Sequence, residues 1–355
     1  MTDPLWTQSA LHPTRAFDAP VLKGRLRAEP EDFVVEEDLG FDPAGAGQHV
    51  LVRVRKRNAN TEWVARELAR IVQCKPFDVG FAGLKDRRAL TTQWFSLPAS
   101  AVSRESLTGM TGQDFEILEA HAHTRKLPRG ALAANIFSIR IRDAEGDDAQ
   151  LTARLNQIRD HGVPNYFGAQ RFGRGGANLG RIDADLRSLQ PKERPFILSA
   201  ARSVIFNAVL AERVREQTWN KLEPGDVANL DGKGSIFAVE ALDESMTERL
   251  ARLDVHPTGP MWGSGELASG GRINDLEARV AAGYARPCAL TVEAGMRQER
   301  RSLRLAVRDL SWERENATDL VIRFRLTRGS FATTVLKEIV DAELQEEGET
   351  HARDR

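Results

Sequence analysis

Four segments with alternating apolar and polar residues lie on both sides of a long middle region, and this split constrains the fold most. Residues 49–56 and 135–142 precede the middle region, and residues 302–310 and 319–326 follow it. Alternation with a period of two is typical of strands with one buried face. We therefore expect strands from both ends of the chain to complete one sheet, with residues from about 160 to 300 inserted between them.

Helical periodicity accompanies these strands. Asn60 is a plausible N-cap of a helix with Val64 and Leu68 on its apolar face, and a longer helix is expected over residues 195–214. Ser330 is expected to cap a last helix that follows the final strand. The fold class is therefore α+β: a mixed or antiparallel sheet with flanking helices, interrupted by an inserted α+β domain.

Composition excludes several classes of protein. The 355 residues carry a formal net charge of −1, which does not indicate a nucleic-acid-binding protein by overall charge alone. The two cysteines, Cys74 and Cys288, form no CxxC motif, which excludes a disulfide framework and the common cysteine zinc sites. We find no secretory signal and no apolar run that approaches the length of a membrane span, so we expect a cytoplasmic protein.

Arginine recurs on the polar side of the alternating segments, as RVR (53–55), RIR (140–142), RLAVR (304–308) and RFR (323–325). One interpretation is a solvated sheet face, since antiparallel sheets commonly leave one face in water. The other is a surface for RNA, because the guanidinium group binds phosphate with two hydrogen bonds. The sequence leaves both interpretations open.

A glycine-rich, aromatic stretch spans residues 162–176. It is neither a Walker A loop nor a Rossmann fingerprint, because the required spacing is missing. Tyr166, Phe167 and Phe172 alternate there with polar and basic residues. The stretch is either a packed turn whose aromatic side chains belong to the core or a nucleic-acid surface.

A single carboxylate, Asp86, lies among the cations Lys85, Arg87 and Arg88 between two apolar segments. It could be an Asx-turn residue between two strands, which is a common role of aspartate. Alternatively, the neighbouring cations hold it ionised, as covalent catalysis at a sugar or an electron-poor ring requires. No second acid lies beside it in the sequence, and no metalloprotease, deaminase or serine-hydrolase motif is found.

Two long motifs resemble those of one family. Residues 83–93 (GLKDRRALTTQ) resemble the Gly-x-Lys-Asp-x-x-Ala-x-Thr-x-Gln motif of the TruD family of tRNA pseudouridine synthases. Residues 164–173 (PNYFGAQRFG) resemble its second signature. Shorter matches are EDFVVEED, the Gly-Ala-Leu-x-x-Asn-x-Phe run at 130–137 and GSFAT at 329–333.

This resemblance implies a domain organisation and a reaction. Residues 1–159 and 307–355 would form a discontinuous catalytic pseudouridine-synthase domain, and residues 160–306 an inserted TRUD domain. The family isomerises a uridine of tRNA, typically at position 13, to pseudouridine. The resemblance implies no cofactor and no metal, and tRNA as the partner of a chain that we expect to be a monomer away from any membrane.

The resemblance also identifies site residues. Asp86 would be the catalytic aspartate, attacking either the sugar C1′ or the uracil C6, and the target base would have to be flipped out of its stack. Phe137 is the expected stacking residue, where most other pseudouridine synthases use tyrosine. The other positions that match family substrate contacts are Phe33, Asn135 and Phe331, and Arg27 matches a basic position near the site.

Two other functions remain as alternatives. A non-catalytic RNA-binding protein that uses the arginine-rich sheet face would retain tRNA without changing its nucleosides. A metal-independent nucleoside hydrolase or glycosylase built on the same aspartate would release free uracil and leave an abasic product.

Overall fold

The computed structural model describes residues 4–101 and 107–344 and divides the chain into two compact units. The sheet unit consists of Val21–Leu151, Arg308–Gly329 and Val340–Arg355. The helical unit consists of Met1–Pro20, Thr152–Val307 and Ser330–Ile339. The first twenty residues and the segment Ser330–Ile339 thus group with the middle of the chain, so these limits differ from the expected domain limits. Which unit is the catalytic domain stays a prediction.

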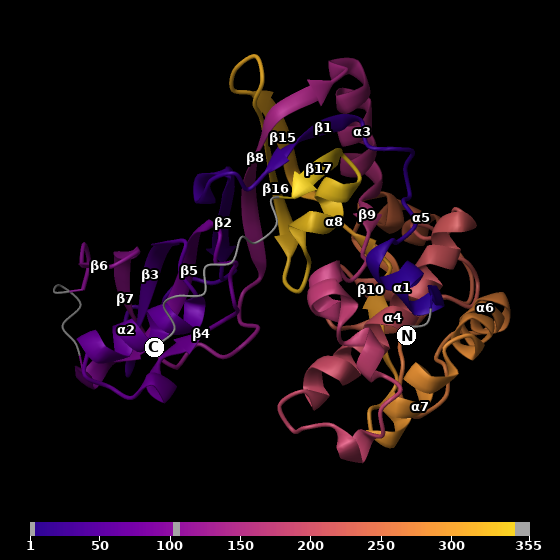
Figure 1. The fold of residues 1–355 in the computed structure, drawn as a ribbon, viewed down its shortest axis with the longest axis horizontal. Helices are drawn as coiled ribbons and strands as arrows, with labels where there is room; N and C mark the ends of the chain where they lie inside the picture. The colour runs from indigo at the N-terminus through magenta and orange to yellow at the C-terminus, as the bar shows by residue number, and fades with distance from the viewer. Residues whose placement is uncertain (1–3, 102–106, 345–355) are drawn as a thin grey trace. The chain divides into compact units, whose positions relative to one another are not determined.

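One mixed sheet organises the sheet unit. In the described part of the chain, eleven strands join it, in the order β15-β16-β8-β2-β5-β3-β7-β6, with β1 beside β8, β17 beside β1 and β4 beside β5. The pairs β2–β5 and β1–β17 are parallel, and the other pairs are antiparallel. Figure 1 shows indigo and yellow strands from opposite ends of the chain in this one sheet. The expected α+β class with a mixed sheet is confirmed.

The strand bounds follow the alternating segments of the sequence closely at most positions. They are β1 Leu22–Leu26, β2 Phe33–Asp38, β3 His49–Arg57, β4 Gly80–Phe81, β5 Leu90–Pro98, β6 Thr111–Gly112, β7 Phe115–His123, β8 Ala134–Gly146, β15 Arg308–Arg314, β16 Leu320–Thr327 and β17 Val340–Leu344.

Helix α2 (Thr61–Ile71) packs on one face of this sheet. Asn60 is its N-cap residue, as expected, although its side chain makes no capping hydrogen bond. Val64 and Leu68 are fully buried against Val52 and Phe95 of β3 and β5. Burial of one such side chain contributes about 1.5–3 kcal/mol, so this helix is held by its apolar stripe. Helix α3 (Asp148–His161) begins after Asp147, which caps it.

The helical unit is built around α4 (Arg194–Arg215), whose buried side chains include Val204, Ile205 and Phe206. Its other elements are α1 Pro4–Leu11, β9 Val163–Pro164, β10 Val227–Leu230, β11 Ile236–Ala238, α5 Glu244–Ala251, β12 Val255–Met261, α6 Gly271–Ala282, α7 Ala285–Glu293, β13 Glu299–Ser302, β14 Arg304–Leu305 and α8 Ala332–Lys337. Among the described residues, α4 is the one helix with the length and apolar composition of a membrane span, but most of it is buried as a core helix is.

The expected continuous strand over residues 302–310 is wrong. The chain forms the short strand β14 and then β15, where Asp309 adopts a φ of 54° and the pairing with β16 shifts register. Arg304 is only 3% exposed and donates to His256 Nδ1 at 3.0 Å, so it does not project from a wet face. The expected cap of the last helix is also wrong, because Phe331, not Ser330, is the N-cap residue of α8.

Candidate active site

The loop that carries Asp86 connects β4 with β5 and is anchored by buried polar side chains. The Lys85 N–H donates to the Thr61 hydroxyl at 3.0 Å, and that hydroxyl donates to Gln93 Oε1 at 2.8 Å. Gln93 Nε2 donates to the Gly83 carbonyl at 3.3 Å. Because Thr61 and Gln93 are buried, water competes little for these hydrogen bonds. Gln93, the last residue of the motif at 83–93, therefore holds the loop that the first residues of the same motif form.

Asp86 presents its carboxylate to solvent from this anchored loop. Its Oδ2 accepts a hydrogen bond from Arg27 Nη2 at 2.8 Å, and its side chain is 52% exposed. The carboxylate is thus held by a cation and accessible to a reacting group. The cation comes from the residue after β1, not from the three sequence neighbours of Asp86.

Lys85 turns away from Asp86. Its ammonium forms an ion pair with the carboxylate of Glu37, and both side chains are almost completely buried. Glu37 also accepts the Trp94 N–H at 3.1 Å, which joins β2 to β5. The expectation that Lys85 holds the charge of Asp86 is therefore wrong, and Lys85 instead fastens the loop to the sheet.

Arg27 has an unusual backbone conformation. Its φ is 58°, in the left-handed region that non-glycine residues rarely adopt. Its guanidinium carbon lies 3.9 Å from the centroid of the Phe33 ring while its Nη2 reaches Asp86. Such strain persists where the surroundings impose it, and it clusters at functional sites.

A row of aromatic side chains continues from Arg27 across the sheet. The rings of Phe33 and Phe137 meet edge to face with centroids 6.1 Å apart, and Phe137 stacks on Phe324 at 5.4 Å. Phe33 and Phe137 are 2% and 6% exposed. Arg27, Phe33, Phe137 and Asp86 are thus joined by direct contacts, as expected for one site. Phe324, which the sequence analysis did not select, completes the row.

Asn135 contributes an unsatisfied polar atom. Its Oδ1 is buried and has no hydrogen-bond partner among the residues that the structure describes. It lies in β8 directly opposite Glu37 of β2, the residue that holds Lys85. A buried acceptor without a donor is destabilising by about 1–3 kcal/mol, and in native structures it is explained by strain, by a catalytic role or by a bound water or ion.

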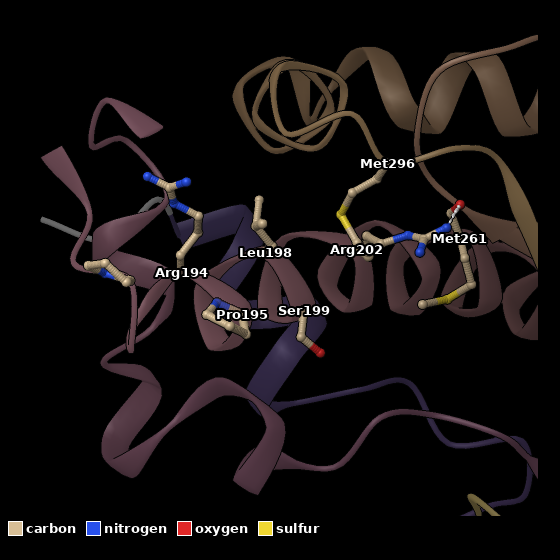
Figure 2. A pocket seen from close by; sticks show the side chains of 8 residues that line it. Arg194, Pro195, Leu198, Ser199, Arg202, Met261 and Met296 are labelled. Carbon is tan, nitrogen blue, oxygen red and sulfur yellow. Dashed lines mark hydrogen bonds between the residues drawn. The ribbon is translucent and has the colours of Figure 1, made fainter. Parts of the chain in front are cut away.

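Phe331 belongs to the helical unit, where it is half-buried as the N-cap of α8. The following residues Thr333 and Lys337 line a cavity of about 400 Å³ together with Tyr166. A second cavity of about 500 Å³ in this unit is lined by α4 residues and by Met261 and Met296 (Figure 2). It contains none of the predicted site residues.

The glycine-rich stretch is a packed turn. Tyr166 and Phe167 are each 5% exposed, and Phe172 is fully buried in the core around α4. Asn207 of α4 fixes the turn, because its side chain accepts the Phe167 N–H at 2.9 Å and donates to the Phe167 carbonyl at 3.0 Å. These aromatic side chains are therefore core residues and not a nucleic-acid surface.

The comparisons with known proteins decide the family. The family model for tRNA pseudouridine synthase D (TruD) matches residues 13–182 and 177–339. A relative named tRNA pseudouridine synthase D from Nitrosococcus oceani is 45% identical over 329 residues, which cover 91% of this chain and 92% of the relative. The protein of the same name from Methylococcus capsulatus is 42% identical, with 93% and 95% covered. This chain belongs to the TruD family. It is thus an enzyme that isomerises uridine to pseudouridine in tRNA.

A solved structure shows the TruD fold as well. The crystal structure of a Methanosarcina mazei protein assigned as tRNA pseudouridine synthase D superposes with a TM-score of 0.74 and covers 95% of this chain and 98% of that one. Its sequence identity is 22%, so this likeness concerns the fold alone. Among the described residues, no group of three or more His, Cys, Asp or Glu side chains is arranged to hold a metal ion.

The arginine-rich face of this TruD chain is largely neutralised. The ion pairs are Arg53 with Glu36 and Glu119, Arg55 with Glu116, Arg140 with Glu315, Arg142 with Asp32, Arg323 with Glu313 and Arg325 with Asp38. A paired guanidinium attracts phosphate less than a free one does. The structure therefore favours the solvated sheet face over the RNA surface.

Lys56 is a residue of the site that the sequence analysis missed. It is fully buried, and its Nζ donates to the carbonyls of Ala59 at 2.7 Å and Asp86 at 3.1 Å. A signal was present, because position 56 continues the buried side of β3 after Val52 and Val54. A lysine on the side of a strand that otherwise carries apolar residues indicates a buried cation with a specific partner.

Proposed function

We propose that Asp86 is the nucleophile of the isomerisation and that the enzyme acts on a uridine flipped out of folded tRNA, at position 13 as is typical of the family. The observation that carries this proposal is an exposed carboxylate on an anchored loop, held by Arg27 at 2.8 Å. The guanidinium orients the carboxylate, and a carboxylate is the nucleophilic form of this side chain.

The reaction conserves all atoms of the nucleotide. The carboxylate of Asp86 attacks either C1′, which expels N1 of uracil, or C6, which forms an adduct on the ring. The N1–C1′ bond is broken, the base rotates and C5 bonds to C1′. The bond from Asp86 to C1′ or C6 is broken in turn, which releases the free carboxylate. The proton on C5 is lost and N1 gains one, so that uridine and pseudouridine are isomers and neither an oxidant nor an energy source is needed.

The flipped base would bind against residues that the site already assembles. Phe137 offers an aromatic edge supported on both sides by Phe33 and Phe324. The unpaired Oδ1 of Asn135 can accept the N3–H of uracil, which would satisfy both groups. The substrate contact expected of Phe331, a residue of the helical unit, stays a prediction. A cytoplasmic location and a monomeric state remain predictions.

The test compares Asp86→Asn with the unaltered enzyme on an unmodified tRNA transcript. A nucleoside digest followed by chromatography measures pseudouridine, uridine and free uracil. We expect the variant to lose at least about a thousandfold in rate, as enzymes do without their nucleophile. Asp78→Asn, at another acid in the segment before β4, is the matched control and should retain the parental rate. Parental activity in Asp86→Asn would refute the assignment.

The same digest separates the alternatives. Free uracil and an abasic site would indicate a glycosylase, and tRNA retained without any change in its nucleosides would indicate a binding protein. The ion pairs along the arginine-rich face do not favour the second alternative.

A further inference from the structure

Asp86 is held from two directions by two different cations. Arg27 binds its carboxylate on the exposed side, and Lys56 binds its backbone carbonyl from the interior at 3.1 Å. The second donor bond of Lys56 goes to the Ala59 carbonyl, one residue before the N-cap of α2. The lysine thus ties together the end of β3, the start of α2 and the main chain of Asp86.

The burial of the Lys56 ammonium does not by itself favour folding. Burial lowers the pKa of Lys56 to about 8, the charge of Lys85 opposes ionisation and the charge of Asp86 favours it. Lys85 and Asp86 both lie on the loop that faces the Lys56 ammonium. Lys85 is paired with Glu37, and Asp86 is paired with Arg27. An apolar residue would match the rest of the buried side of β3, and burying it instead of a charge avoids a desolvation penalty.

We propose that Lys56 is a positioning residue for the reaction, which fixes the main chain of Asp86 so that its carboxylate meets the reacting ring in the productive geometry. This inference rests on the proposed role of Asp86. Lys56 has no exposed surface, so it acts on the reaction through the groups that it contacts, among them the main chain of Asp86. Displacement of a reacting group by about 1 Å lowers a rate by about a hundredfold, which gives the scale of the effect.

The experiment measures single-turnover rate and tRNA affinity for Lys56→Met, which removes the charge and the donors and leaves an unbranched side chain one atom shorter. We expect the rate to fall about 10- to 100-fold while the Kd for tRNA stays within about twofold. The matched control is Arg57→Met, the next residue of β3, which is half-exposed and pairs with Glu31. Because exposed ion pairs contribute little, the control should keep the parental rate.

The pH profile supplies a readout that a purely structural role would not change. The unaltered enzyme should lose rate as pH rises through about 8, where Lys56 gives up its proton. In the same range this lysine makes folding more favourable, because its pKa is lower in the folded chain than in the unfolded one. The titration of Lys56 would therefore not by itself unfold the chain in this range. Lys56→Met should lack this alkaline decline.

The outcomes are distinct. A folded Lys56→Met with the parental rate overturns the inference, and so does a loss of rate matched by an equal loss of tRNA affinity. If Lys56→Met does not fold, Lys56→Leu, which also removes the charge and the donors, carries the same comparison. Activity in Asp86→Asn would overturn the proposed function instead, whatever Lys56 does.

Discussion

Arg27 binds Asp86 from a backbone conformation that few non-glycine residues adopt. The 2.8 Å contact between Nη2 and Oδ2 joins a residue that follows the first strand to a loop that precedes the fifth. The same guanidinium covers the Phe33 ring, so its position is set by an aromatic surface as well as by charge. Arg27 and Phe33, which are close in sequence, therefore share one geometry with the distant Asp86, the proposed nucleophile.

Replacing Arg27 should reduce catalysis more than stability. We expect Arg27→Met to lower the single-turnover rate about tenfold or more, because the carboxylate loses the group that orients it. The free energy of unfolding should change by less than about 1 kcal/mol, since the partner carboxylate is half-exposed. Arg70→Met, at a 73% exposed side chain of α2, is the control for the loss of an arginine. A parental rate for Arg27→Met would contradict the proposed role.

Replacing Asn135 by an apolar residue should lower the rate of the reaction without lowering the free energy of unfolding. Its Oδ1 is buried without a partner among the described residues, so Asn135→Val removes an unsatisfied acceptor. We expect a free energy of unfolding equal to or above the parental value, measured by urea denaturation, and a rate at least about tenfold lower. Ser138→Val, in the same strand β8, controls for a β-branched replacement. Destabilisation of Asn135→Val would show that the oxygen has a partner in solution.

Glu338 should make the helical unit less stable as pH rises from about 4.5 to about 7. Burial raises the pKa of this carboxyl to about 7, although backbone N–H groups of Ala16 and Phe17 partly oppose the shift. The folded chain then holds a proton that the unfolded chain has lost, and stability falls across this range. Glu338→Gln should gain up to about 3 kcal/mol at pH 8 and almost nothing at pH 4.5. Equal effects at both pH values would contradict this prediction.

The buried pair of Arg213 and Asp226 should be essential to the helical unit. Arg213 Nη1 lies 2.8 Å from Asp226 Oδ1, and the two side chains are 1% and 0% exposed. Arg213→Met leaves a buried, unpaired carboxylate, and we expect a loss of about 3–5 kcal/mol in the free energy of unfolding. The double variant Arg213→Met/Asp226→Leu should recover part of that loss. Chemical denaturation of both variants measures the coupling, and equal losses would rule it out.

Periodicity predicted the sheet well because burial of one face imposes it. The alternation over residues 49–56 and 319–326 became β3 and β16, and Val64 and Leu68 became the buried stripe of α2. Periodicity did not reveal that Arg304 lies inside, because its partner His256 is 48 residues away. Interactions between residues distant in sequence decide such cases, and a local pattern contains no information on them.

The candidate site could be predicted only where family motifs matched. Asp86 stood out as a lone carboxylate among cations, and the resemblance selected Phe33, Phe137 and Arg27. Direct contacts join these residues in the structure. The electrostatic partners were not predictable from sequence neighbours, since Lys85 next to Asp86 turns to Glu37. A loop that reverses direction sends adjacent side chains to different places, so proximity in sequence is a poor measure of electrostatic coupling.

The parallel pairing of β1 with β17 has a consequence for biosynthesis. Leu22 of β1 lies opposite Val340 of β17. A strand that is synthesised early therefore pairs with a strand that is synthesised late. During translation the N-terminal segment emerges long before this neighbour exists, and its edge stays open to other chains until the ribosome has passed residue 344. A chain with this pairing would depend on chaperones or on rapid translation to avoid misassembly before its synthesis ends.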